Sequence, residues 1–237
     1  MSVRAYLHEH FAALGPVQEH PFQEGSEAGT NLILRLLGQQ PRLDPLLVGA
    51  DDNATGVAAL LELARRWNQS PRRRPVWLVA FDQEEWGMLG SKALARDLRQ
   101  AGQTLRLMVS LEMLGYTGPS QDYPLAAMRR IYGDAGDFIA VVGNAAAALT
   151  LPQLAGAMGQ HVKTRVLPVP ISGRLLPDVR LSDHSPFWDA GYDAVMVTDT
   201  SFMRNPNYHC MSDTIDTLDL PFLAAVTEGL DAALGRL

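Results

Sequence analysis

The chain has 237 residues, of which 47% are hydrophobic and 19% are charged, and its formal net charge is −6. This composition is typical of a globular protein with one large core, so we expect a single domain spanning residues 1–237. The negative charge and the lack of a long Lys or Arg run argue against a nucleic-acid partner and against binding to an anionic membrane.

The single cysteine and the first residues of the chain bear on where the protein works. One cysteine, Cys210, excludes an internal disulfide framework and is compatible with a reducing compartment. The first ten residues lack the apolar core of a signal peptide, and no apolar run is long enough to span a bilayer. We therefore expect a cytoplasmic protein without a membrane partner.

The first half of the chain alternates between helical and strand patterns. Apolar residues at helical spacing predict a helix at 3–14, which Gly15-Pro16 ends. Strands are predicted at 31–37 and 46–50, followed by a helix at 57–67. The continuously apolar run at 75–81 predicts a strand that is buried on both faces.

The second half continues this alternation. The predicted elements are a helix near 91–101, a strand within 105–116, a loop-rich connection at 117–136, a strand at 137–143, a helix at 144–158, a Pro-rich loop at 168–177 over the site, a short helix opening at 181–188, a strand at 194–198 and a helix at 217–237. Strands that alternate with helices predict an α/β fold with a largely parallel sheet.

Five side chains with metal-binding chemistry lie just after or near the ends of predicted strands, where ligands gather in open α/β sheets. They are Asp52, Glu84, Glu85, Glu112 and His209. Two adjacent carboxylates in a half-buried turn need a cation or an unusual protonation state. Zinc takes histidine nitrogen and carboxylate oxygen, and a nearby carboxylate that is not a ligand can act as general base. The set therefore suits zinc.

Each of these residues also has a structural explanation when it is taken alone. The Asp51-Asp52-Asn53 run could cap the following helix, and the Glu pair could be a solvated surface turn. A lone His209 in a polar loop is more often solvated than metal-bound. The combination of all five favours the metal site. His184, next to Asp183, could support a ligand or face the substrate.

Five motifs together resemble the M28 family of zinc aminopeptidases. They are Gly49-Ala50-Asp51-Asp52-Asn53-Ala54-Thr55-Gly56, Glu84-Glu85 with Gly87 and Gly90-Ser91, Leu111-Glu112-Met113-Leu114-Gly115-Tyr116, Ser182-Asp183-His184 with Pro186-Phe187, and Tyr208-His209 with Asp213-Thr214. They follow family order from about residue 30 to the end of the chain. The resemblance implies a three-layer α/β sandwich with a mixed, mostly parallel central sheet and a peptide substrate.

The resemblance also implies a role for each matching residue. Asp52 would bridge two zinc ions, with a cis peptide bond to Asn53, and Glu84 would be the general base. Glu85 and Glu112 would bind different zinc ions, and His209 would be a further ligand. Residues that would support the ligands or face the substrate are Asp51, Asp183, His184, Tyr208 and Asp213.

Two departures from the family pattern change the expected metal content. Glu112 stands where family members usually have Asp, and the His-x-Asp segment that supplies the first histidine ligand is missing, since no histidine lies between His20 and His161. We therefore expect one tightly bound zinc, held by Asp52, Glu112 and His209 with Glu85 nearby, and low turnover. Two zinc ions per chain with full activity would mean that one of the other histidines, with His20 as the first candidate, occupies the vacant position.

Three functions follow from this site. The first is a zinc-dependent aminopeptidase in which Glu84 takes a proton from the attacking water. The second is a glutaminyl cyclase-like aminoacyl cyclotransferase, which needs one zinc. The resemblance implies that the cyclases have an acidic residue where this chain has Ser182, which disfavours this function. The third is a weakly active or inactive relative that binds peptides. Side-chain preference and oligomeric state are not determined by the sequence.

Overall fold

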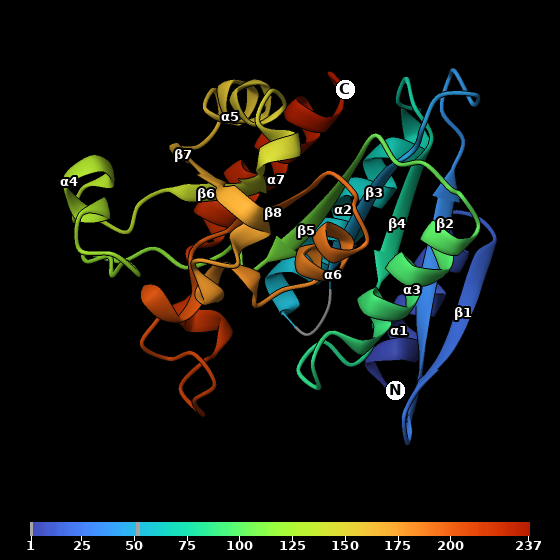
Figure 1. Cartoon of the computed structure of the whole chain (residues 1–237), viewed down its shortest axis with the longest axis horizontal. Coiled ribbons are helices and arrows are strands. Elements are labelled where there is room, and N and C mark those ends of the chain that lie inside the picture. The colour runs from blue at the N-terminus through green and yellow to red at the C-terminus, as the bar shows by residue number, and fades with distance from the viewer. Residues whose placement is uncertain (1, 51–52) are drawn as a thin grey trace.

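The computed structural model describes residues 2–50 and 53–237 of the chain. Within these ranges, eight strands form one sheet in the order β1-β2-β4-β3-β5-β8-β6-β7 (Figure 1). The strands are β1 Val17–Glu24, β2 Glu27–Leu36, β3 Leu46–Ala50, β4 Val76–Ala80, β5 Leu107–Glu112, β6 Ile139–Asn144, β7 Thr164–Val169 and β8 Ala194–Thr198.

The sheet is mixed and mostly parallel, as predicted. Strand β3 pairs in parallel with β4 and with β5, β5 pairs in parallel with β8, and β6 with β7. The β1-β2 hairpin joins β4 in antiparallel orientation, and β6 runs antiparallel to β8.

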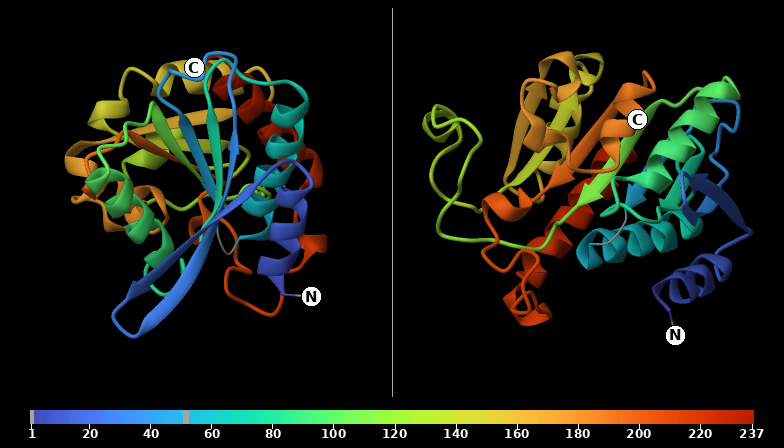
Figure 2. Two further views of the ribbon diagram at one scale, coloured as in Figure 1. Left: turned by 90° about the vertical axis from the view of Figure 1, so that its right-hand side faces the viewer. Right: turned by 60° about the horizontal axis from the view of Figure 1, so that its bottom comes forward.

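Helices cover both faces of the sheet, which confirms the three-layer α/β architecture (Figure 2). They are α1 Val3–Ala12, α2 Ala54–Gln69, α3 Leu89–Gln100, α4 Met128–Tyr132, α5 Leu151–Met158, α6 His184–Asp189 and α7 Leu220–Leu234. Helices α1, α2, α5 and α7 share one apolar core with the sheet, and α3 and α6 share a second core on the opposite face. In the described part of the chain, no helix is long and apolar enough to cross a membrane.

The central strands show why continuous apolar runs predict them correctly. Successive side chains of a strand point to opposite faces, so a strand covered by helices on both sides must be apolar at every position. In β4, Leu78 contributes to the core under α2 and α7, whereas its neighbours Trp77 and Val79 contribute to the core under α3 and α6. Full burial of such a side chain contributes about 1.5–3 kcal/mol.

Two strands were not predicted, and both lie at the edges of the sheet. Strand β1 contains Pro21 and mostly exposed or half-buried positions, and it pairs only with β2. Strand β7 is largely half-buried and pairs only with β6. The loop predicted at 168–177 therefore begins within β7 and continues as short 3₁₀ turns. An edge strand has a neighbouring strand on one side only and is more exposed to solvent, so its sequence lacks the continuous apolar pattern of a buried strand.

Some predicted boundaries also differ from the structure. Strand β2 begins at Glu27 rather than near residue 31, and the helix predicted at 144–158 begins only at Leu151. Asn144 Oδ1 accepts a hydrogen bond from the Ala147 backbone N–H and caps a separate 3₁₀ turn there. The connection at 117–136 contains the short helix α4, which stands at the left of Figure 1, and a β-bridge between Gly118 and Gly136 closes its base.

Candidate active site

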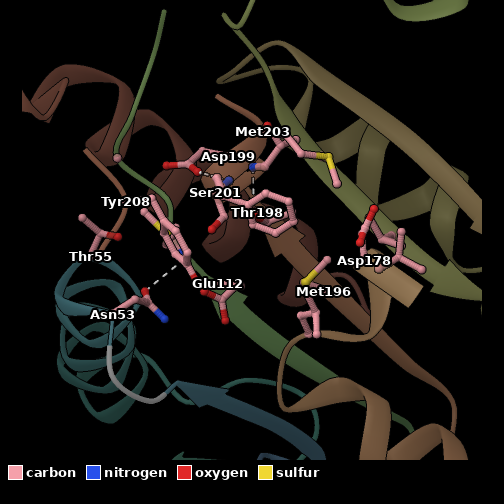
Figure 3. A pocket seen from close by; sticks show the side chains of 18 of the residues that line it. Asn53, Thr55, Glu112, Asp178, Met196, Thr198, Asp199, Ser201, Met203 and Tyr208 are labelled. Carbon is pink, nitrogen blue, oxygen red and sulfur yellow. Dashed lines mark hydrogen bonds between the residues drawn. The ribbon is translucent and has the colours of Figure 1, made fainter. Parts of the chain in front are cut away.

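A pocket of about 800 Å³ opens where β4, β5 and β8 end and extends over the sheet face that carries β6 and β7. Among the residues that line it are the predicted Glu84, Glu85, Glu112, Tyr208, His209 and Asp213. Figure 3 shows Glu112 inside the pocket, with Asn53 and Tyr208 to one side and Met196 to the other. The fold thus brings together residues that lie up to 129 positions apart in the sequence, from Glu84 to Asp213 (213 − 84).

The loop that carries Glu84 and Glu85 is fixed by a buried asparagine from β2. Asn31 Oδ1 accepts a hydrogen bond from the Asp82 N–H at 3.0 Å, and its Nδ2 donates one to the Gly90 carbonyl at 2.9 Å. The Asp82 carboxylate in turn accepts a hydrogen bond from the Thr30 N–H at 2.8 Å. Both ends of the loop are therefore tied to β2, which presents the two glutamates to the pocket.

Glu112 is the last residue of β5, and its carboxylate lies in an environment with excess negative charge. Burial, together with the charges of Glu84, Asp199 and Glu85, raises the pKa of Glu112 to about 8, while a hydrogen bond from Ser182 opposes the shift. Ser182 Oγ also shares a hydrogen bond of 2.8 Å with Ser110 Oγ. Without a cation nearby, this carboxyl group is mostly protonated at neutral pH.

His209 lies beside Glu85 at the rim of the pocket. Its Nε2 is 2.7 Å from Glu85 Oε1, and its ring stacks on Tyr208 with a centroid separation of 3.9 Å and an interplanar angle of 15°. The Tyr208 hydroxyl also hydrogen-bonds Ser201. The histidine side chain is thus held by a carboxylate and an aromatic ring that both line the pocket.

The start of α2 is locked to the end of β5. Asn53 Oδ1 accepts hydrogen bonds from the backbone N–H groups of Gly56 and Met113, at 2.6 and 3.1 Å, and its Nδ2 donates to the Leu111 carbonyl. A Cβ atom on Gly56 would collide with Asn53 Oδ1 and with the Leu111 carbonyl, so this position requires glycine. The helix cap predicted from the sequence is therefore present, and Asn53 provides it.

Left-handed backbone conformations cluster around the pocket. Gln83, Met113, Thr200, Ser201 and His209 all have positive φ values between 46° and 79°. Such values cost conformational energy for residues other than glycine and persist where the surrounding structure enforces them, which is common at functional sites.

Two of the predicted residues, Asp51 and Asp52, lie outside the described residues. The predicted cis peptide bond between Asp52 and Asn53 lies outside them too. The structure therefore bears on the remaining ligands and on the frame that surrounds them.

His184 is away from the pocket, although it was predicted to support a ligand or to face the substrate. Its side chain is fully buried, its Nε2 is 2.8 Å from the Val179 carbonyl, and its ring meets Trp188 edge-on at 4.3 Å. Burial lowers the pKa of His184 to about 3, so the ring is neutral. Neither His184 nor its buried neighbour Asp183 is among the pocket-lining residues. Both residues lie at the start of α6, which is packed into the core, and this packing keeps their side chains away from the pocket.

His20, the predicted substitute for the missing ligand, is engaged elsewhere. Its Nε2 lies 3.1 Å from Asp97 Oδ2 on α3, and its Nδ1 lies 3.1 Å from Asn31 Nδ2. The residue does not line the pocket. In this structure His20 supports the packing of β1 against α3 and is not available as a ligand.

Two buried charged residues, Asp199 in the pocket lining and Arg204 outside it, were not predicted. Asp199 follows β8 directly, is 1% exposed, and accepts hydrogen bonds from the Tyr116 and Ser201 N–H groups. Burial raises its pKa to about 6, and the charge of Arg204 opposes that shift. Arg204 is also buried and donates to Gln121 and to the backbone carbonyls of residues 116 and 138. Asp199 carries the same signal as the other candidates, a carboxylate after an apolar strand, and could have been found.

The donor chemistry of the pocket fits a metal ion, although the described residues do not form a complete set of ligands. Among them, no group of three or more His, Cys, Asp or Glu side chains is arranged to hold a metal. Yet three glutamates converge near His209, and the pKa of Glu112 is raised by burial and by the charges of the other two. A cation would relieve this repulsion, and Asp52, outside the described residues, is the further ligand implied by the family resemblance.

Comparison with known proteins identifies similar sequences. A family model described as Peptidase family M28 matches residues 35–233. The Escherichia coli protein named "Uncharacterized protein YfbL" is 40% identical over 187 residues, which cover 77% of this chain and 58% of that protein. A "Probable zinc metalloprotease" of Pyrenophora tritici-repentis is 32% identical over 164 residues, covering 62% of this chain and 36% of that protein. The chain thus spans less than two thirds of the length of these curated relatives.

Solved structures share the fold. The LapA aminopeptidase of Legionella pneumophila matches with a TM-score of 0.71 and 17% identity, over 98% of this chain and 64% of that chain. The glutaminyl cyclase of Macrostomum lignano matches with the same TM-score and 16% identity, over 99% of this chain and 82% of that chain. The fold is therefore common to both enzyme types and does not discriminate between them.

Proposed function

The chain belongs to peptidase family M28, and from this membership we propose that it is a zinc-dependent aminopeptidase, which hydrolyses the N-terminal peptide bond of peptides. The observation that carries the proposal is the convergence of Glu84, Glu85, Glu112 and His209 in one pocket at the strand ends. The sequence relative named as a probable zinc metalloprotease supports zinc as the metal. A cytoplasmic location remains part of the proposal and is supported by the single, exposed Cys210.

In the proposed mechanism the side chains of the chain have separate tasks. Glu84 accepts a proton from the attacking water and later delivers it to the leaving amine. Glu112 and His209, together with Asp52, hold the metal, and Ser182 orients Glu112 through its hydrogen bond. Zinc, when bound there, supplies Lewis-acid polarisation of the scissile carbonyl.

We propose one zinc ion per chain. A second ion would have Asp52 and Glu85 but no imidazole, since His20 is bonded to Asp97 and Asn31. A catalytic zinc usually takes three protein ligands, so two carboxylates make a weak site. Glu85 instead stays within hydrogen-bond distance of His209 and fixes its ring.

Alanine variants of the two adjacent glutamates test these roles. Glu84→Ala should lower the hydrolysis of aminoacyl anilides by about a hundredfold to ten-thousandfold while zinc content stays near that of the parent protein. Glu85→Ala should lose zinc, because it removes the partner of His209. The matched control is Glu9→Ala, on the exposed face of α1, which should change neither quantity. The reverse pattern, with zinc lost only in Glu84→Ala, would contradict the assignment.

A glutaminyl cyclase-like activity is the second candidate, because one zinc suffices for it and the chain covers 82% of the cyclase structure. Ser182 argues against it, since the cyclase pattern has an acidic residue at this position. Incubation with a peptide that begins with Gln separates the two activities. Loss of ammonia with ring closure indicates the cyclase, and release of free Gln indicates the aminopeptidase. Binding of the peptide with neither product, with or without a chelator, indicates the peptide-binding relative.

A further inference from the structure

Arg165 on β7 is a positive charge in a pocket whose other charged groups are mainly acidic. Among the described residues that line the pocket, it is the only Arg or Lys. The acidic residues of the lining are Glu84, Glu85, Glu112, Asp178, Asp199 and Asp213. The proposed reaction uses the groups at the strand ends and leaves Arg165 without a role.

Arg165 and Glu112 lie in one row across the sheet. Strand pairing joins Glu112 to Thr198, Thr198 to Ala140, and Ala140 to Arg165. Residues paired in this way point to the same face, and all four line the pocket. Neighbouring strands are about 4.8 Å apart, so three steps place the two backbones about 14 Å from each other.

The span of this row suits a short peptide. An extended chain covers about 3.4 Å per residue, so about four residues would cover the whole distance. A peptide whose N-terminal residue lies beside Glu112 can therefore place a carboxylate at Arg165, from an acidic side chain or from its own C-terminus.

The guanidinium of Arg165 has no acceptor in the described structure. Its Nε is buried and lacks a hydrogen-bond partner, and no ion pair within 4 Å joins it to a described carboxylate. The nearby hydroxyls of Tyr123 and Tyr132 donate to the backbone carbonyls of residues 133 and 166. Asp178, which also lines the pocket, is exposed and does not pair with Arg165.

The surroundings of Arg165 favour binding of an anion. The rings of Tyr123 and Tyr132 stack at 6.1 Å beside it, and Phe138 and Leu167 add apolar surface to the same part of the pocket. Charge-assisted hydrogen bonds are stronger where apolar groups exclude water, and the guanidinium can bind a carboxylate through two parallel N–H groups.

We propose that Arg165 binds a carboxylate of the peptide substrate and so makes the pocket selective for short peptides that carry a carboxylate at this distance from the N-terminus. This inference rests on the proposed function for the identity of the ligand as a peptide. The recognition step itself is binding alone, so it can be measured without turnover. The carboxylate comes either from an acidic side chain about four residues from the N-terminus or from the C-terminus of a peptide of about that length.

Calorimetric titration of the zinc-loaded full chain carrying Glu84→Ala tests the proposal with two pairs of peptides. Leu-Ala-Ala-Glu-amide against Leu-Ala-Ala-Gln-amide isolates an acidic side chain at the fourth residue, and Leu-Ala-Ala-Ala against its C-terminal amide isolates the C-terminal carboxylate. In at least one pair the carboxylate form should bind about tenfold to a hundredfold more tightly. Arg165→Gln should abolish this preference, and Arg165→Lys should keep part of it. Arg130→Gln, on the exposed surface of α4, makes the same charge change and should have no effect.

The outcomes separate this inference from the proposed function. Equal binding within both pairs, a preference that survives Arg165→Gln, or no binding of any of the four peptides would overturn the role of Arg165. A preference that depends on Arg165, in a chain with intact Glu84 that hydrolyses none of the peptides, supports the inference and contradicts the aminopeptidase. Hydrolysis without a preference supports the aminopeptidase and removes Arg165 from the binding site.

Discussion

Asn31→Ala is expected to loosen the loop that carries Glu84 and Glu85. Asn31 is completely buried in β2, and its amide is bonded to the backbone at both ends of this loop, at Asp82 and at Gly90. The variant removes both bonds at once and leaves the part-buried Asp82 N–H without a partner, whereas the Gly90 carbonyl lies within α3 and keeps its helical acceptor role. It also removes the contact with His20 Nδ1.

The structure sets the magnitude of the effect. An unsatisfied buried polar group costs about 1–3 kcal/mol, so the loss of the partner of the Asp82 N–H should lower the free energy of unfolding by about that amount. The upper part of this range would be a large share of the stability of a typical domain, which is about 5–15 kcal/mol. If the loop shifts so that water replaces Asn31 as the hydrogen-bond partner of its backbone, the loss of stability is smaller, but the two glutamates change position. Hydrolytic activity should then fall even in the fraction that is folded.

Urea unfolding followed by circular dichroism measures the stability term, and hydrolysis of aminoacyl anilides measures the placement of the glutamates. The matched control is Asn68→Ala on the exposed surface of α2, which should leave both unchanged. A loss below about 0.5 kcal/mol with full activity would refute the reasoning, because solvent-exposed substitutions commonly produce changes of that size. A large loss of stability with full activity would show that Asn31 stabilises β2 without positioning the loop.

Two further predictions concern buried charged groups. Because the pKa of His184 is lowered from 6.5 to about 3, the unfolded state binds more protons between these values, and stability should fall by up to about 1.4 kcal/mol per pH unit as the pH drops through this window. Urea midpoints measured across the window should show this slope, and His184→Gln should reduce it by about one proton; an unchanged slope would exclude His184 as its source. Arg204→Met should lower the free energy of unfolding by about 3–5 kcal/mol, because it removes the positive charge that acts on the buried Asp199 and the hydrogen bonds to Gln121 and to two backbone carbonyls. Arg204→Lys should recover little of this in thermal unfolding, because an ammonium group cannot reach all of these acceptors; a fully stable Arg204→Met protein would contradict the bonding role.

The sequence by itself predicted the central part of the fold. Strands β3, β4 and β5 are buried on both faces, so their apolar runs report burial directly and do not depend on knowing the neighbouring elements. The same logic located Glu84, Glu85 and Glu112, because a carboxylate that follows a buried strand lies at the edge where α/β proteins bind ligands. The family motifs then gave these residues roles, which the experiments above test.

The tertiary structure decided what depends on contacts between distant segments. The edge strands β1 and β7 could not be predicted, since their burial comes from one neighbour and leaves no regular apolar pattern. Asn31 and Arg204 look like ordinary polar residues until the fold surrounds them with backbone partners 51 to 88 positions away. His184, which the sequence predicted to support a ligand or to face the substrate, is a neutral ring in the core. Only strand pairing shows that Arg165 lies in the same row as Glu112. Local sequence specifies which side chains a strand carries, whereas the register between strands specifies which residues lie opposite them.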